Sequence, residues 1–315
     1  MATSSSVDFS MTRNEIIQDA LSSIGVLGSE ESIQNSDLEI GSRALNRLIK
    51  SWESKAIHIW KRTEALLFVQ ASQSKYTLGT GTTDHCTETF VSTTLSANAA
   101  TSATSLTITS TTGMTVGDYI GILLDSGAFH WTTITAIPST VTITTALPSA
   151  ATSGNNVFTY TTNISKPLYI YNARRYDMDS ETEIQMNNLA YDDYMNLPNK
   201  NTDSGSEPFS YMYNRNLNNG DFYVWPQPGT VGSLVKLTYA KPIQDFDSAT
   251  DTPDLPQEWY DAVVLNLAVK LAHMYGKASG QTYAALKVEA KEALNDALSF
   301  DNDLDYVQFS VDFNG

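Results

Sequence analysis

A long segment without positive charge constrains the fold of this chain most. No lysine or arginine occurs between Lys75 and Lys166, and threonine dominates that segment. The sequence on both sides has mixed charge and the patterns of ordinary helices and strands. This change in composition predicts a discontinuous body, residues 11–79 and 164–300, that carries an inserted domain, residues 80–163.

The net charge restricts the possible partners. The chain has 315 residues, with 35 acidic against 19 basic side chains and a formal charge of −16. Tight binding to phosphate backbones needs clustered Lys and Arg, so this balance argues against a nucleic-acid-binding protein. It fits a protein that stays in solution at high concentration, or one past which DNA slides.

The single cysteine and the lack of targeting signals restrict the possible disulfides, metal sites and cellular compartments. The single cysteine, Cys86, cannot form a disulfide framework or a cysteine-based zinc site within one chain. No apolar run is long enough to span a bilayer, so we expect no membrane partner. Residues 1–10 are small and polar, which predicts a flexible N-terminus and not a secretory signal. We therefore expect the chain to be made and folded in a cytoplasm.

Helix signals mark both ends of the body. Two pairs of residues have the spacing of a capping box: Thr12 with Glu15, and Ser36 with Glu39. Apolar residues follow each pair at helical spacing, so we expect a helical hairpin that ends near Trp52. Two further helices are predicted near the C-terminus, one starting at Pro256 and one over residues 282–298.

Strand signals fill the rest of the body. A single antiparallel sheet is the simplest account of these segments, with a short helix over residues 189–197. The segments are 66–69, 76–79, 168–170, 211–213, 221–225 and 234–239.

The predicted insert reads as all-β. Residues 106–109 and 141–144 alternate apolar and polar side chains, and turn signals recur at even spacing. This pattern predicts a small sandwich or barrel. The whole chain is therefore predicted to be α+β, with a helical bundle packed with a small antiparallel sheet and an inserted all-β domain.

Catalytic and cofactor motifs are missing from the sequence. There is no phosphate-binding glycine loop and no nucleophile elbow. The histidines lie far apart and lack metal-ligand spacing: His58, His85, His130 and His273. We expect no enzyme activity, no metal and no cofactor.

Carboxylate pairs leave a glycosidase open as an alternative. Glu181 with Glu183, or Asp192 with Asp193, could form an acid and base pair. Solvated faces of an acidic protein explain them more simply. A third alternative is a glycan-binding accessory protein that acts through the β insert.

Aromatic residues favour packing over nucleic-acid binding. Residues 222–225, Phe-Tyr-Val-Trp, could stack on bases, but no basic residues alternate with them. Core and subunit contacts explain them better. Trp52, Trp225 and Trp259 are the residues that we predict to pack between subunits.

The C-terminal segment, residues 301–315, has a strand pattern. Val307, Phe309, Val311 and Phe313 alternate with polar residues. An extended segment of this kind can complete a sheet of another chain, or it can fold back onto its own subunit.

A set of motifs in a fixed order now points to a family. They are Trp52, Trp60, Ser-Lys-Tyr-Thr-Leu-Gly at 74–79, Phe-Tyr-Val-Trp-Pro-Gln-Pro at 222–228, Leu-Thr-Tyr-Ala at 237–240, Asp-Leu-Pro-Gln-Glu-Trp at 254–259 and a helix ending at Tyr275-Gly276. The body resembles the head-to-tail adaptor proteins of short-tailed bacteriophages, which include packaged-DNA stabilisation and tail tubular A proteins. The resemblance covers both ends of the body and leaves out the insert.

The resemblance implies a structural role in the virion, after assembly in the host cytoplasm. It implies a ring, usually of twelve subunits, beneath the portal protein, with a tail nozzle or needle and sometimes fibres on the other face. DNA would pass through the lumen without sequence-specific binding and leave through it on ejection. The C-terminal segment would reach the portal through Tyr306, Val307, Phe309, Val311 and Phe313. Some members have been credited with peptidoglycan hydrolysis, but no residue here matches that activity.

Overall fold

The chain forms two compact units, which are described separately. The computed structural model describes residues 9–28, 31–54, 61–137, 139–178, 180–200, 202 and 207–300. The helical unit combines the chain up to Lys61 with the part from Ile243 onward, and the β unit is Arg62–Pro242. The predicted mixture of helices and antiparallel sheets is confirmed.

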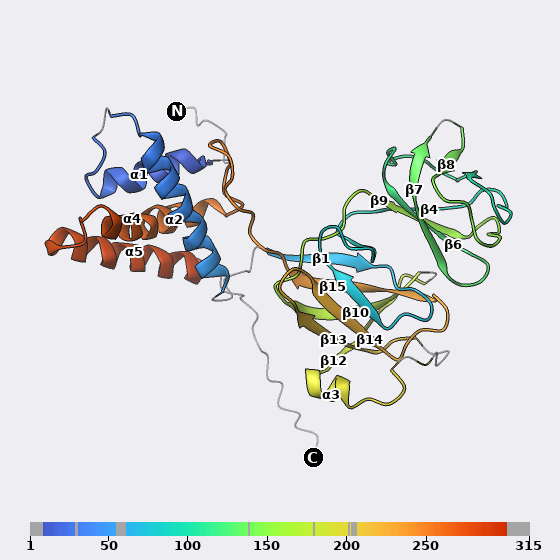
Figure 1. The fold of residues 1–315 in the computed structure, drawn as a ribbon. Helices are drawn as coiled ribbons and strands as arrows, with labels where there is room; N and C mark the ends of the chain where they lie inside the picture. The colour runs from blue at the N-terminus through green and yellow to red at the C-terminus, as the bar shows by residue number, and fades with distance from the viewer. Residues whose placement is uncertain are drawn as a thin grey trace, which may run out of the picture. The chain divides into compact units, whose positions relative to one another are not determined.

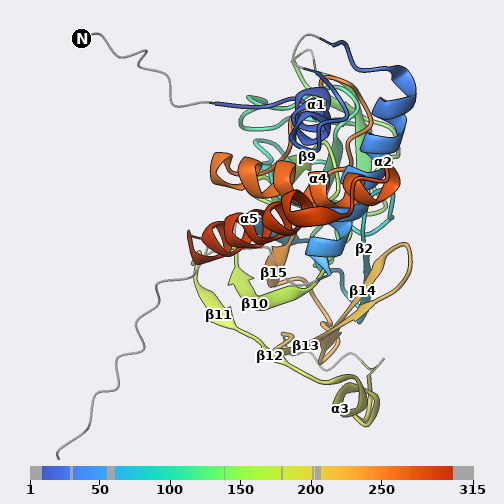
Figure 2. The ribbon, with the colours of Figure 1, turned by 90° about the vertical axis from the view of Figure 1, so that its left-hand side faces the viewer.

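Helix α4 is the centre of the helical unit. It contacts α1, α2 and α5 and lies between α1 and α5 (Figures 1 and 2). A short 3-10 turn, η2, leads into it. The helices are α1 (Arg13–Ser23), α2 (Asn35–Glu53), η2 (Gln257–Trp259), α4 (Tyr260–Met274) and α5 (Gly280–Phe300).

The two predicted capping boxes have different outcomes. Thr12 and Glu15 form theirs, since each side chain bonds the backbone N–H of the other residue. The box predicted at Ser36 and Glu39 is wrong, because α2 already begins at Asn35. Ser36 therefore lies inside the first turn, and the N-cap residue, Gln34, makes no side-chain capping bond.

A close approach joins α1 to α2. A Cβ added at Gly41 would lie 2.4 Å from Cγ2 of Ile17, which is fully buried. The helices can therefore meet at this distance only because residue 41 is glycine. The core of the unit continues through α4, where Leu267 and Leu271 are fully buried.

The strands predicted as one body sheet form two sheets. One has the order β11-β10-β15-β1-β3 and the other β12-β13-β14-β2, and all pairs are antiparallel except β12 with β13. Their buried residues belong to one hydrophobic cluster, so the two sheets share a core. The elements are β1 (Arg62–Leu67), β2 (Lys75–Leu78), β3 (Cys86–Thr87), β10 (Ile170–Asp177), β11 (Glu183–Gln185), β12 (Asn187–Asn188), α3 (Tyr191–Met195), β13 (Ser210–Arg215), β14 (Gly220–Trp225) and β15 (Ser233–Ala240).

A third sheet of six strands curls within residues 91–160. Its order is β4-β9-β6-β7-β8-β5, and backbone hydrogen bonds from Ser96 N to Thr107 O and from Thr109 N to Thr94 O join its two edges. It encloses its own small core, which includes Ile120 and Val157. The strands are β4 (Val91–Thr94), β5 (Ser105–Leu106), β6 (Tyr119–Leu123), β7 (Phe129–Ala136), β8 (Val141–Ile143) and β9 (Asn156–Tyr160).

Aromatic rings connect this third sheet to the strands around it. Phe68, directly after β1, lies with its ring centroid 4.9 Å from that of Trp131 and 5.1 Å from that of Phe158. Phe129 and Tyr160 belong to the same buried cluster. The third sheet therefore shares part of its packing with the first two.

Several predicted features lie outside the described residues. These are residues 1–8 of the N-terminus, His58, Trp60 and the segment 301–315 with Tyr306, Val307, Phe309, Val311 and Phe313. In the described part of the chain, no helix has the length and hydropathy needed to cross a bilayer.

Candidate interaction surfaces

Two of the three predicted packing tryptophans lie inside the helical unit. Trp52 on α2 and Trp259 on η2 are buried, with ring centroids 5.7 Å apart in an edge-to-face arrangement. They fix α2 against the start of α4. Their role between subunits stays a prediction.

The third, Trp225, lies at the end of β14 in the β unit. Its ring is partly buried and meets Phe209 edge-to-face, with centroids 5.0 Å apart. Phe209 is 45% exposed, so this aromatic pair reaches the surface. Contact with a neighbouring subunit through Trp225 likewise stays a prediction.

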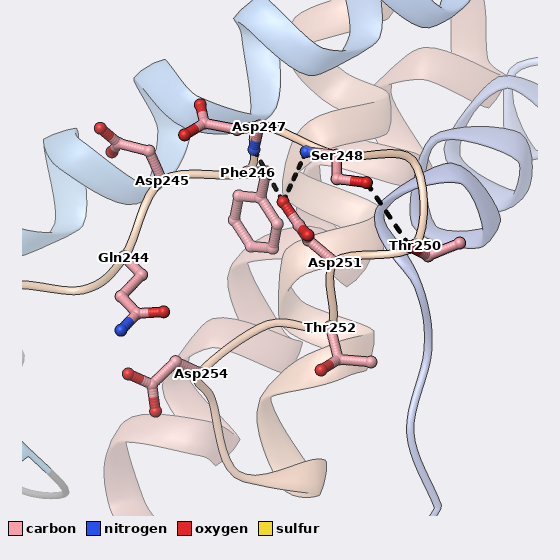
Figure 3. Close-up of a pocket in the computed structure, with 9 residues that line it drawn as sticks. All are labelled: Gln244, Asp245, Phe246, Asp247, Ser248, Thr250, Asp251, Thr252 and Asp254. Carbon is pink, nitrogen blue, oxygen red and sulfur yellow. Dashed lines mark hydrogen bonds between the residues drawn. The ribbon is translucent and has the colours of Figure 1, made fainter. Parts of the chain in front are cut away.

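An acidic loop, residues 244–254, surrounds a cavity of about 560 Å³ in the helical unit (Figure 3). The Asp251 carboxylate accepts hydrogen bonds from the backbone N–H groups of Asp247 and Ser248, at 2.9 and 2.6 Å. Asp245 pairs with Lys50 at 3.0 Å, and Asp254 pairs with Lys61. Three of the four carboxylates thus hold the loop in place.

The same loop is fastened to both N-terminal helices. Asn46 on α2 exchanges hydrogen bonds with the backbone of Phe246, at 3.0 and 3.3 Å. Arg13 donates from its backbone N–H to Asp251 O and from its guanidinium to Asp247 O. The cavity is therefore part of the scaffold, and none of the described residues forms a cluster of three or more His, Cys, Asp or Glu side chains suited to a metal.

Three of the candidate glycosidase carboxylates have identifiable local surroundings. Glu183 forms ion pairs with Lys236 and, at 2.8 Å, with Arg174. The hydrogen bond from Lys236 is the main reason that the pKa of Glu183 is lowered, which disfavours a role as general acid. Asp192 and Asp193 are exposed in the first turn of α3.

The described histidines make separate local contacts. His85 Nδ1 lies 2.6 Å from Tyr160 Oη, and His273 Nε2 lies 2.6 Å from Tyr283 Oη. His130 Nε2 lies 3.1 Å from the carbonyl of Thr145. Each of these three side chains therefore has a local partner of its own.

The basic side chains of the two units differ in how many have partners within the chain. Every Lys and Arg of the β unit has a hydrogen bond, an ion pair or a ring contact: Arg62, Lys75, Lys166, Arg174, Arg175, Lys200, Arg215, Lys236 and Lys241. In the helical unit, four exposed basic side chains have no such partner among the described residues: Arg43 and Arg47 on α2, Lys277, and Lys291 on α5.

These two arginines border a shallow groove of about 540 Å³. Its apolar part comes from Ile40 and from Met274, which is 47% exposed at the end of α4. We call Ile40, Arg43, Arg47 and Met274 the arginine face. Sequence reasoning missed it, although the four-residue spacing of two arginines outside the apolar stripe of α2 was visible.

A second exposed surface runs along α5. Ala285, Val288, Glu289, Glu292 and Asp296 are all exposed and recur at helical spacing, so they form one stripe. Val288 is 56% exposed, and the three carboxylates have no partner among the described residues. We call these five residues the α5 stripe.

The sequence model of one protein family, SU10 adaptor protein, matches residues 127–310, which is more than half of the chain. The chain belongs to this family of phage head-to-tail adaptors. None of the curated proteins matches it.

The match confirms the family predicted from the ordered motifs. It also changes which part of the chain resembles that family. It begins at Gly127, so it includes residues 127–163, which we had expected the resemblance to leave out. It does not include α1 and α2. The arginine face of this adaptor lies mostly outside the matched range, whereas the α5 stripe lies within it.

Proposed function

We propose that this adaptor is a structural virion protein that forms a ring between the portal and the tail. The observation that carries the proposal is the family match over residues 127–310. The ring would have twelve subunits, as the resemblance implies, would help to retain packaged DNA, and would receive a tail nozzle or needle, and in some cases fibres, on its far face.

The charge of the chain supports a role as a channel. A formal charge of −16 on each subunit would give a ring a strongly acidic surface. Like charges repel, so DNA would pass through such a lumen without binding to it.

The portal contact is proposed to lie in residues 301–315. Their alternating apolar side chains suit addition to a sheet of the portal, through Tyr306, Val307, Phe309, Val311 and Phe313. Removing residues 301–315 should leave a folded chain that no longer attaches to the portal, as measured by co-sedimentation of the two proteins.

Residues 80–163 are proposed to form the domain that decorates the outside of the ring and contacts fibres, a neighbouring subunit or the capsid. Their position between strands of the body supports this assignment. Replacing residues 80–163 of the full-length chain with a short linker should then leave rings on the portal intact, and loss of rings would show that the segment takes part in assembly.

Electron microscopy of the purified protein mixed with its portal tests the central proposal. Rings of density stacked on the portal are expected. A chain that remains a single subunit in the presence of the portal would overturn the proposal. A peptidoglycan zymogram tests the enzymatic alternative, for which a cleared zone would be the positive result.

A further inference from the structure

We propose that the arginine face of one subunit packs against the α5 stripe of a second copy of this chain. The inference rests on the proposed ring and names the two surfaces that would join its subunits. It follows from the charges that the fold leaves without partners.

The first observation is where unpaired positive charge occurs. All the cations of the β unit are engaged within the chain, whereas Arg43, Arg47, Lys277 and Lys291 of the helical unit are exposed and have no partner among the described residues. Of these four, the two arginines carry the guanidinium groups that can pair with carboxylates through two hydrogen bonds. They lie one helical turn apart, beside the apolar side chains of Ile40 and Met274. Arginines next to exposed apolar groups are enriched in protein interfaces.

The second observation is that α5 presents a complementary surface. Glu289, Glu292 and Asp296 line one side of the helix, and Val288 and Ala285 lie beside them. Lys287 and Lys291 border this surface, in a groove that Val288 and Glu292 also line. The two surfaces therefore match in both respects, since carboxylates can face guanidinium groups and apolar side chains can face apolar side chains. Both surfaces also lie largely along one helix each, α2 and α5.

The third observation concerns topology. The arginine face is formed by α2 and the end of α4, and no residue of α5 lines its groove. One subunit thus has two different surfaces, and joining one to the other in the next copy gives a head-to-tail contact. Contacts of this type generate closed rings when the rotation between subunits closes.

Reciprocal charge reversal in the full-length chain tests the pairing. We expect Arg43→Glu with Arg47→Glu, and separately Glu289→Lys with Glu292→Lys, to weaken ring formation on the portal by about tenfold or more, because each places like charges opposite one another. The chain with all four substitutions should form rings again. Sedimentation and electron microscopy of each mixture give the readout.

A matched control uses two exposed carboxylates outside both surfaces. Asp192 and Asp193 lie in the first turn of α3, in the β unit, and are exposed. Replacing both with Lys makes the same change in net charge as the Glu289 and Glu292 variant and should leave rings intact. Circular dichroism establishes that each variant is folded, which is expected because all the altered side chains are exposed.

The results of these experiments distinguish a failure of the proposed pairing from a failure of the proposed ring. Rings that tolerate either charge reversal, or that are lost and not restored by the fourfold variant, would overturn the pairing while the wild-type rings sustain the proposed function. Absence of rings for the wild-type chain with portal would overturn both.

Discussion

The imidazole of His85 packs among the aromatic rings of Tyr119, Trp131 and Tyr160 in the β unit. It stacks on Trp131, with ring centroids 3.9 Å apart and planes 16° apart. Since the Tyr160 hydroxyl donates its proton to Asn163 Oδ1, His85 Nδ1 must be the donor to Tyr160. Burial lowers the pKa of His85 to about 4, from an ordinary value of 6.5.

This shift makes the stability of the β unit depend on pH. The unfolded chain takes up a proton near pH 6.5, whereas the folded chain does so only near pH 4, so stability is complete above pH 6.5 and decreases as the pH falls toward 4. We expect this group to contribute a loss of about 3 kcal/mol. Urea unfolding at several pH values, compared with a His85→Gln variant, measures it. An equal pH dependence in both proteins would contradict the assignment.

A single methyl group at residue 220 should destabilise the β13–β14 hairpin. A Cβ there would lie 2.1 Å from Tyr213 Oη, and that hydroxyl is held by a hydrogen bond of 2.6 Å to Pro167 O. Gly220→Ala should therefore cost about 1–3 kcal/mol of unfolding free energy. A double-mutant cycle with Tyr213→Ala checks the cause. The double mutant should lose less unfolding free energy than the two single mutants lose together.

At the scale of elements, Gly41 sets the distance between α1 and α2. Gly41→Ala would favour the helix by about 1 kcal/mol, but the new methyl would overlap Ile17, at a typical cost of about 1–3 kcal/mol. Because Ile17 is fully buried and cannot move aside, we expect net destabilisation in thermal unfolding. Ser51→Ala, at an exposed position of the same helix, is the control and should be neutral or stabilising.

The elements themselves were predictable where their signals are local. The Thr12 and Glu15 box fixes the start of α1, and strands such as β14 follow from alternation and turn residues. The division into two body sheets was not predictable, because it depends on which distant strands pair. For example, β1 pairs with β15, and β2 with β14, and nothing in the four segments themselves specifies these partners.

The interaction surfaces were predictable only in part. The motifs gave the family, and the strand pattern gave a proposed portal contact in residues 301–315. The arginine face could not be ranked from the sequence, because the sequence does not show which basic residues have partners within the chain. Arg174 is an example: the sequence shows only a basic pair, whereas the fold places it beside Glu64 and Glu183.

At the scale of the whole molecule, the helical unit and the β unit have separate hydrophobic cores, which predicts two unfolding steps. Leu267 is fully buried in the helical unit and Leu237 in the β unit. Replacing either with Ala should destabilise its own unit by about 2–5 kcal/mol and leave the other step unchanged. Calorimetry of both variants checks this expectation. If both substitutions shifted the same step, the units would unfold as one.

The only cysteine of the chain gives the β unit a natural reporter. Cys86 on β3 is 2% exposed, and burial raises the pKa of its thiol, so the reactive thiolate scarcely forms in the folded protein. An alkylating reagent can therefore modify it only while these strands are transiently apart. The rate of that modification, followed by mass spectrometry on the purified protein, would show how often these strands separate, with no label or engineered residue needed.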